Sequence, residues 1–229
     1  MDSKMDTKMN SMDTMDTMTM DQPPQYSKED PTQQFQSHQP SRGLEVTFTS
    51  CSGRHLKVTE NTSDGPIVYS ADLKSRKPHM IFQSNGTAHL PATVKFHNFS
   101  RAIDVSIHGE EMPMAAKCWT FKHEYSFTSH AVSGKSFFWR KASWRYLHLQ
   151  CVDESGTVFA TFRSHKSWSG KKAGRLEIMP AAAEGGQGLV DELVVTGLAD
   201  VYYQMMQAMA ASGTSAASAS SAAAVSVTV

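Results

Sequence analysis

The residues best suited to binding chemistry lie between Gly134 and Arg175. This segment contains nine lysines and arginines against two acids, a net charge of +7. Three tryptophans are interleaved with these charges: Trp139, Trp144 and Trp168. Basic groups attract phosphate oxygens, each worth about 1 kcal/mol near an anionic leaflet, and tryptophan favours the membrane interface. The combination predicts a surface for anionic phospholipid headgroups, such as those of phosphoinositides.

Eight basic residues make up the candidate lipid-binding site: Arg140, Lys141, Arg145, Arg163, Lys166, Lys171, Lys172 and Arg175. The competing interpretation is a solvated outer face whose charges are balanced elsewhere, with the tryptophans packed in the core. Tryptophan and arginine also stack on nucleic-acid bases. Because the chain has no RNP, KH or helix-turn-helix pattern, we expect no nucleic-acid partner.

Other side chains capable of chemistry do not form a recognisable site. The best metal-ligand spacings are Cys51 with His55 and His123 with His130, and neither has a second pair at zinc-ligand distance. The segment 167–170 lacks the first glycine of a nucleophile elbow. Asp153 and Glu154 are adjacent in a turn, where we expect them to be solvated. The sequence therefore predicts no enzyme, no metal and no cofactor.

Composition limits the cellular setting. Lysine plus arginine equals aspartate plus glutamate at 22 each, so any anionic partner requires a local patch. Cys51, Cys118 and Cys151 cannot all pair and include no CxxC spacing, which favours reduced thiols. The N-terminus has no apolar signal-peptide region. We expect a cytoplasmic monomer, peripheral at a membrane or nuclear.

The elements that must position these residues are mostly strands. Leu44, Val46 and Phe48 alternate with polar residues, and similar short runs recur every 8–14 residues as far as Met179. About eleven strands are expected, and one long strand includes Trp119 to Phe127. Residues 1–43, a Met-Asp-Thr repeat and a Gln/Pro-rich run, have no periodic apolar face and are expected to be disordered, as is the Ala/Ser-rich tail 212–229.

The one long helical candidate is Gly188–Ala211. Twelve large apolar residues surround it, while Glu192, Thr196, Asp200, Gln204 and Gln207 fall on one stripe about 120° wide. We therefore expect burial over two thirds of its circumference, with Leu198 facing the strands and the polar stripe tolerating a charge. Three acids argue against a membrane span, since each costs about 2.5–3.5 kcal/mol on insertion.

Many strands followed by one apolar helix predict an antiparallel barrel that encloses the helix, because a wide barrel needs its interior filled. The barrel domain is expected over residues 44–211.

Two stretches, FRSHKSWSGKKAGRLEI (162–178) and GLVDELVVTGLADVYYQ (188–204), resemble the Tubby C-terminal-like superfamily, especially its LURP-one-related and uncharacterised fungal members. The resemblance covers residues 44–209 and implies a barrel of roughly twelve strands around a C-terminal helix. It also implies lipid binding through surface lysine and arginine, as in Tubby-like proteins. The acidic loop and cysteine cluster of phospholipid scramblases have no counterpart here.

The sequence thus predicts a non-enzymatic binding module that recognises anionic phospholipid through a basic patch. Two alternatives remain open at this point: a protein-interaction or regulatory barrel without a lipid ligand, and a carrier of a small apolar molecule. A filled interior favours surface binding, whereas an apolar cavity beside the helix favours a carrier.

Overall fold

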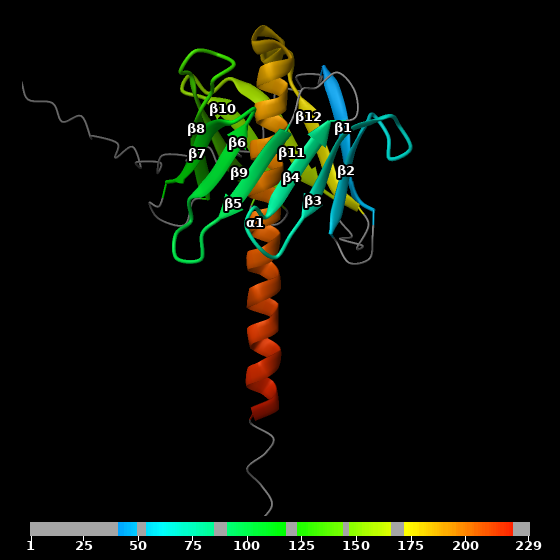
Figure 1. Ribbon diagram of the computed structural model, residues 1–229, viewed down its shortest axis with the longest axis vertical. Coiled ribbons are helices and arrows are strands. Elements are labelled where there is room, and N and C mark those ends of the chain that lie inside the picture. Colours follow the sequence, from blue (N-terminus) through cyan, green and yellow to red (C-terminus); the bar gives the residue numbers. More distant parts are fainter. Residues whose placement is uncertain are drawn as a thin grey trace, which may run out of the picture. The chain divides into compact units, whose positions relative to one another are not determined.

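The computed structural model of the chain describes residues 41–49, 54–84, 91–117, 123–143, 147–165 and 172–221, with side chains as far as Ala211. Within these ranges, twelve strands form one closed antiparallel barrel around a single long helix, α1 (Figure 1). This confirms the predicted fold class. The segments 1–40 and 222–229, expected as tails, lie outside the described residues.

The strands pair in chain order, and β1 closes the barrel against β12 with Leu44 opposite Leu176. Their bounds are β1 Arg42–Phe48, β2 His55–Glu60, β3 Ile67–Leu73, β4 Met80–Ser84, β5 Pro91–Phe96, β6 Ile103–Ile107, β7 Glu110–Ala116, β8 Glu124–Thr128, β9 Ser136–Ser143, β10 His148–Asp153, β11 Val158–Ser164 and β12 Lys172–Ile178. The barrel thus begins at Arg42, two residues before the predicted boundary.

The sequence predicted about eleven strands, and the strand that it did not predict is β7. Its sequence, EEMPMAA, has no β-branched or aromatic residue and contains a proline, which argues against a central strand. The structure accommodates Pro113 because only Ala115 and Ala116 of β7 pair with β8. The long strand expected from Trp119 is β8, which begins at Glu124, and residues 118–122 lie outside the described residues.

Alternate residues of the strands point inward and form a continuous core with α1. Val46, Val94 and Phe162 are examples, each without solvent exposure. The most bulky of these inward side chains is Trp139 on β9, also fully buried. Trp139 therefore packs in the core, as the competing interpretation of the basic segment predicted for its tryptophans.

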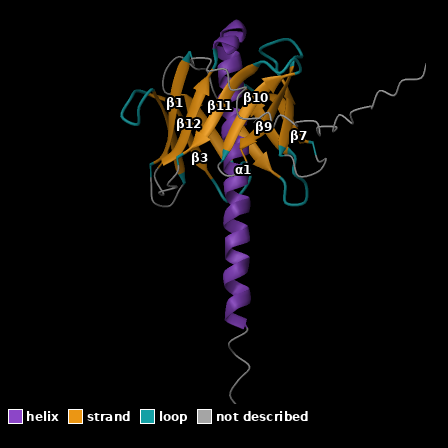
Figure 2. Cartoon of the chain, turned by 180° about the vertical axis from the view of Figure 1, so that it is seen from behind, coloured by secondary structure: helices purple, strands orange, loops and turns teal. Residues whose placement is uncertain are grey.

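A short 3-10 helix, Pro180–Gly185, leads from β12 into α1, which spans Gly186–Ser221. The helix enters the barrel at one end, fills its interior and continues beyond the other end (Figure 2). Its backbone is helical for ten residues past Ala211, where the sequence interpretation ended it.

Residues 189–201 of α1 are buried on every side, which corrects the expected orientation of the polar stripe. Leu198 faces the core as predicted, but Glu192, Thr196 and Asp200 are buried as well. Only the last two members of the stripe approach solvent: Gln204 is half-buried and Gln207 is exposed. The polar stripe therefore faces the barrel wall, and a new charge at Thr196 would be buried.

Four of these residues, Glu192, Thr196, Asp200 and Gln204, form a polar row that bonds to the wall along β8 and β9. Glu192 accepts the Ser129 hydroxyl and the backbone N–H groups of His130 and Ala131. Trp139 Nε1–H donates to Thr196 Oγ1 over 2.9 Å, and this hydroxyl donates to the Glu192 carbonyl. These bonds compensate the cost of burying the helix's polar groups.

The lower part of the row is held by a histidine. His123 Nε2 lies 2.6 Å from Asp200 Oδ1, and Gln204 Nε2 donates to the same oxygen over 3.1 Å. The row thus contacts the wall at three levels along the barrel.

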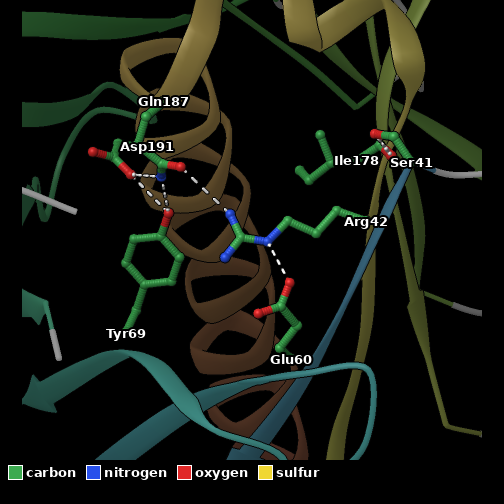
Figure 3. A network of polar contacts seen from close by, with 7 residues as sticks. All are labelled: Ser41, Arg42, Glu60, Tyr69, Ile178, Gln187 and Asp191. Atoms are coloured by element: carbon green, nitrogen blue, oxygen red, sulfur yellow. Dashed lines mark hydrogen bonds and ion pairs between the residues drawn. The ribbon is translucent and has the colours of Figure 1, made fainter. Parts of the chain in front are cut away.

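A second network holds the first turn of α1 (Figure 3). The Tyr69 hydroxyl donates to Asp191 Oδ1 over 2.7 Å. Gln187 Nε2 donates both to the Tyr69 hydroxyl oxygen and to Asp191 Oδ1. Burial, and then the Asp191 carboxylate, raise the pKa of Tyr69 well above its usual value. Arg42 connects this network to β2 by donating to Gln187 and pairing with Glu60 at 3.1 Å. The first residue of β1 thereby helps to fix the register of the helix.

We predict that Gly197→Ala destabilises the barrel although it raises helix propensity. A Cβ at this position would lie 2.7 Å from Trp139 Cζ2, and the indole cannot shift without losing its bond to Thr196. Overpacking of this kind costs about 1–3 kcal/mol, more than the ~1 kcal/mol that alanine gains over glycine in a helix. Urea denaturation should show a lower free energy of unfolding for the variant. The same change in a Trp139→Phe background should cost less, and a stabilised single variant would contradict this packing.

Candidate functional site

The two ends of the barrel carry different sets of connections, because an antiparallel meander places alternate connections at the same end. At one end, called here the helix-entry end, Ser129 to Ala131 after β8 bond Glu192 near the start of α1. At the other, the helix-exit end, Phe96 at the end of β5 contacts Tyr202 and Tyr203 on α1. The connections β1–β2, β3–β4, β5–β6, β7–β8, β9–β10 and β11–β12 all belong to the helix-exit end.

Basic side chains gather at the helix-exit end. Those in the described parts of its connections are all exposed: Arg54, Lys74, Arg76, Lys77, Arg101 and Lys117. The described parts of these connections contain no aspartate or glutamate, although Lys117 pairs with Glu124 at the start of β8, at 3.6 Å. At the helix-entry end the described connections carry three acids, Asp64, Glu154 and Glu184, and one lysine, Lys135. The described connections at the two ends therefore differ in formal charge, +6 (6 − 0) at the helix-exit end against −2 (1 − 3) at the helix-entry end.

The same six connections are also rich in aromatic residues. In the sequence they contain ten lysines and arginines, no acid, and six aromatic side chains. Of the aromatics, Phe99 lies in the described residues and is fully exposed. The others lie outside the described residues: Trp119, Phe121, Trp144, Tyr146 and Trp168. The connections at the helix-entry end contain no aromatic residue in the sequence.

The predicted lipid-binding residues are only partly brought together. Arg140, Arg163 and Arg175 lie on β9, β11 and β12, and Arg163 is directly opposite Arg175. Lys141 and Lys172 lie near the helix-exit ends of their strands, and both are exposed. Three further predicted residues lie outside the described residues: Arg145, Lys166 and Lys171.

Two of the wall arginines are occupied by ion pairs. Arg140 Nε lies 2.9 Å from Glu124 Oε2, and Arg175 Nε lies 3.5 Å from Glu177 Oε1. Arg175 also donates to the Asn61 carbonyl. For these two residues the structure matches the alternative of an outer face balanced by nearby acids.

Sequence reasoning missed the basic residues that precede Gly134. The available signal was the alternation of connections: once the chain is read as a meander of twelve strands, every second connection carries lysine or arginine and no acid. Among the other connections, only that between β8 and β9 carries a lysine. Grouping charges by contiguous segment instead combined Lys135, which lies at the helix-entry end, with residues of the helix-exit end.

A cleft of about 750 Å³ opens at the helix-exit end between the β3–β4 connection, the end of β5 and α1. Arg54 and Lys74 supply positive charge, and Phe96, Tyr202 and Met206 supply apolar surface. His79 also lines it, and its Nδ1 accepts the Phe96 backbone N–H over 3.0 Å. Burial, followed by the charges of Lys77 and His97, lowers the pKa of His79.

The other groups considered for chemistry have structural roles. Cys151 is buried, and burial raises the pKa of its thiol. Asp153 was expected to be solvated and is instead buried against Lys135, at 2.9 Å. Burial alone would raise the pKa of Asp153, but hydrogen bonds from Ser155, Lys135 and Thr157 lower it to about 2.

The histidines of the proposed metal spacing lie apart. His123 bonds Asp200 near the helix-exit end, whereas His130 faces Glu110 at the helix-entry end. Among the residues that the structure describes, no cluster of three or more histidine, cysteine or acidic side chains could hold a metal ion. Within the same residues, no helix has the length and apolar character needed to cross a membrane.

A family model matches residues 54–199, from just before β2 into the buried part of α1, and its description is "Family of unknown function (DUF6593)". The chain belongs to this family. Neither the comparison with curated proteins nor that with solved structures finds a match. The DUF6593 match spans eleven of the strands and the polar row as far as Thr196, while β1 and the end of α1 lie outside it.

We predict that His79 contributes to a loss of stability in mild acid. Its folded-state pKa lies below the ordinary value of 6.5, so the unfolded chain binds a proton more readily and unfolding is favoured as pH falls through that value. His79→Gln should reduce the fall in melting temperature between about pH 7.5 and pH 5.5. An unchanged fall in the variant would mean that the histidine is not held neutral.

Proposed function

We propose that this DUF6593 barrel is a peripheral binding module that docks its helix-exit end on an anionic phospholipid surface. The observation that carries the proposal is the segregation of charge: six exposed lysines and arginines in the described connections of that end, without an acid among them. Each basic group held near an anionic leaflet contributes about 1 kcal/mol, so a cluster of such groups supplies several kcal/mol of attraction.

Apolar groups at the same end support a membrane rather than a purely electrostatic partner. Phe99 is fully exposed in the β5–β6 connection, where its side chain has no packing role. The helix that leaves this end carries Met209, which is largely exposed, and residues 201–229 contain no charged side chain. Aromatic and apolar side chains beside a ring of basic residues suit the boundary between headgroups and acyl chains.

The interior of the barrel argues for surface binding over transport of a small apolar molecule. Leu189, Leu193 and Val194 of α1 are fully buried among inward-facing strand residues. A helix that fills the interior supports the alternative in which recognition takes place outside. The proposal therefore moves the predicted site from the β9–β12 wall to the barrel end, keeping Lys141 and Lys172 as neighbours of that end. The resemblance to the Tubby C-terminal-like superfamily is consistent with this proposal.

The test is co-sedimentation with vesicles of phosphatidylcholine containing phosphatidylserine. Arg76→Gln combined with Lys77→Gln removes two exposed charges from the helix-exit end. Two lost contributions of about 1 kcal/mol each predict a decrease in affinity of about tenfold or more. Raising the salt concentration from 0.1 M to 1 M should also weaken binding, since the Debye length falls from about 10 Å to about 3 Å.

The matched control is Thr62→Glu combined with Ser133→Glu. Both positions are exposed at the helix-entry end, and the pair changes net charge by the same amount as the first variant. Binding of this control should match that of the unaltered chain. Equal loss in both variants would mean that only net charge matters, and absence of binding by the unaltered chain would remove the proposal in favour of a protein partner.

A further inference from the structure

The cleft at the helix-exit end combines features that a flat basic surface does not have. It is a concave space of about 750 Å³ in which charged, hydrogen-bonding and apolar groups lie on different sides. Arg54 and Lys74 approach it from the β1–β2 and β3–β4 connections, while Tyr202 and Met206 form the side contributed by α1. Its volume lies within the usual range of sites for small molecules, and its apolar residues lie beside a few polar groups.

The positive groups of the cleft are available for a ligand. Arg54 and Lys74 are exposed, and neither takes part in an ion pair among the described residues, in contrast to Arg140 and Arg175 on the wall. Asp72 on β3, two residues before Lys74, is engaged by His55 at 2.7 Å. Asp104 on β6 is engaged by His97 at 2.8 Å. Among the described residues that line the cleft, none is an aspartate or a glutamate.

His79 adds a positioned hydrogen-bond donor. Because its Nδ1 accepts the Phe96 N–H, the proton of the neutral ring must lie on Nε2. The ring packs against Phe96 with centroids 5.3 Å apart, which restricts its orientation. Burial, followed by the charges of Lys77 and His97, favours this neutral form.

We propose that this cleft binds the terminal phosphate monoester of a lipid. Such a group carries a charge between −1.5 and −2 at neutral pH and presents three terminal oxygens. These oxygens suit Arg54, Lys74 and His79 Nε2–H, whereas a phosphodiester carries a single charge and two free oxygens. The acyl-bearing part of the ligand then lies against Phe96, Tyr202 and Met206, a surface that continues on α1 towards exposed Met209.

This inference rests on the proposed function in one respect: the lipid is presented by the membrane on which the helix-exit end docks. The experiment compares vesicles containing phosphatidic acid with vesicles containing phosphatidylserine, at fractions chosen to give the same surface potential. We expect the unaltered chain to prefer phosphatidic acid by at least about fivefold, corresponding to roughly 1 kcal/mol, the typical net contribution of one hydrogen bond.

The decisive variant is Arg54→Gln combined with Lys74→Gln, which should abolish the preference. Its matched control, Lys141→Gln combined with Lys172→Gln, removes the same charge near the same end but on β9 and β12, outside the cleft lining. This control should weaken binding to both kinds of vesicle and keep the ratio between them. Circular dichroism and thermal melts of both variants establish that the fold is unchanged before the ratios are compared.

The outcomes separate the two proposals. Equal binding of the unaltered chain to both kinds of vesicle overturns the phosphate-monoester cleft and leaves the proposed function in place. A preference that survives Arg54→Gln/Lys74→Gln also overturns the cleft. Calorimetric titration with glycerol 3-phosphate forms a separate arm: binding there, without binding to any vesicle, overturns the lipid source and the proposed function together.

Discussion

The structure depends on pairing the polar groups that α1 carries into the barrel. A closed barrel of twelve strands has an interior that must be filled, and one helix fills it here. Apolar burial alone would allow the helix to slide or rotate, because hydrophobic contact is non-directional. Glu192, Thr196 and Asp200 remove that freedom, since each is buried and has a partner at a fixed place on the wall. Displacing the helix would leave buried charges and hydroxyls unpaired, at about 1–3 kcal/mol for each neutral group and more for each charge.

The register of the helix also decides which residues appear at each barrel end. With Asp191 held by Tyr69 at the helix-entry end, Tyr202 and Met206 reach the helix-exit end, where they complete the cleft. The uncharged continuation of α1 leaves through the end with the basic connections. The interior network and the proposed binding surface are therefore linked through the register of α1.

Strand alternation and the apolar content of α1 were sufficient to predict a barrel around a helix. The polar row was expected on the solvent-facing side of the helix, because a polar stripe on a helix usually faces solvent. Its partners, among them Trp139 and His123, lie 57 and 77 residues away from the row in sequence, and no local pattern relates them. Strand β7 was missed because tertiary pairing overrode its low propensity. The basic end could have been found by assigning alternate connections to alternate ends, but only with β7 in the strand count, because omitting one strand reverses the assignment of every later connection.

Native-state hydrogen exchange of α1 tests the central claim that the helix is an integral, register-locked part of the core. If the polar row and the apolar contacts hold it as described, the amides of residues 189–201 should exchange only when the whole domain unfolds. Their opening free energy should then equal that of the best protected amides of β10 and should fall equally with added denaturant. Exchange of α1 at a clearly lower free energy, with the strands still protected, would show that the helix leaves the barrel independently and would contradict this account.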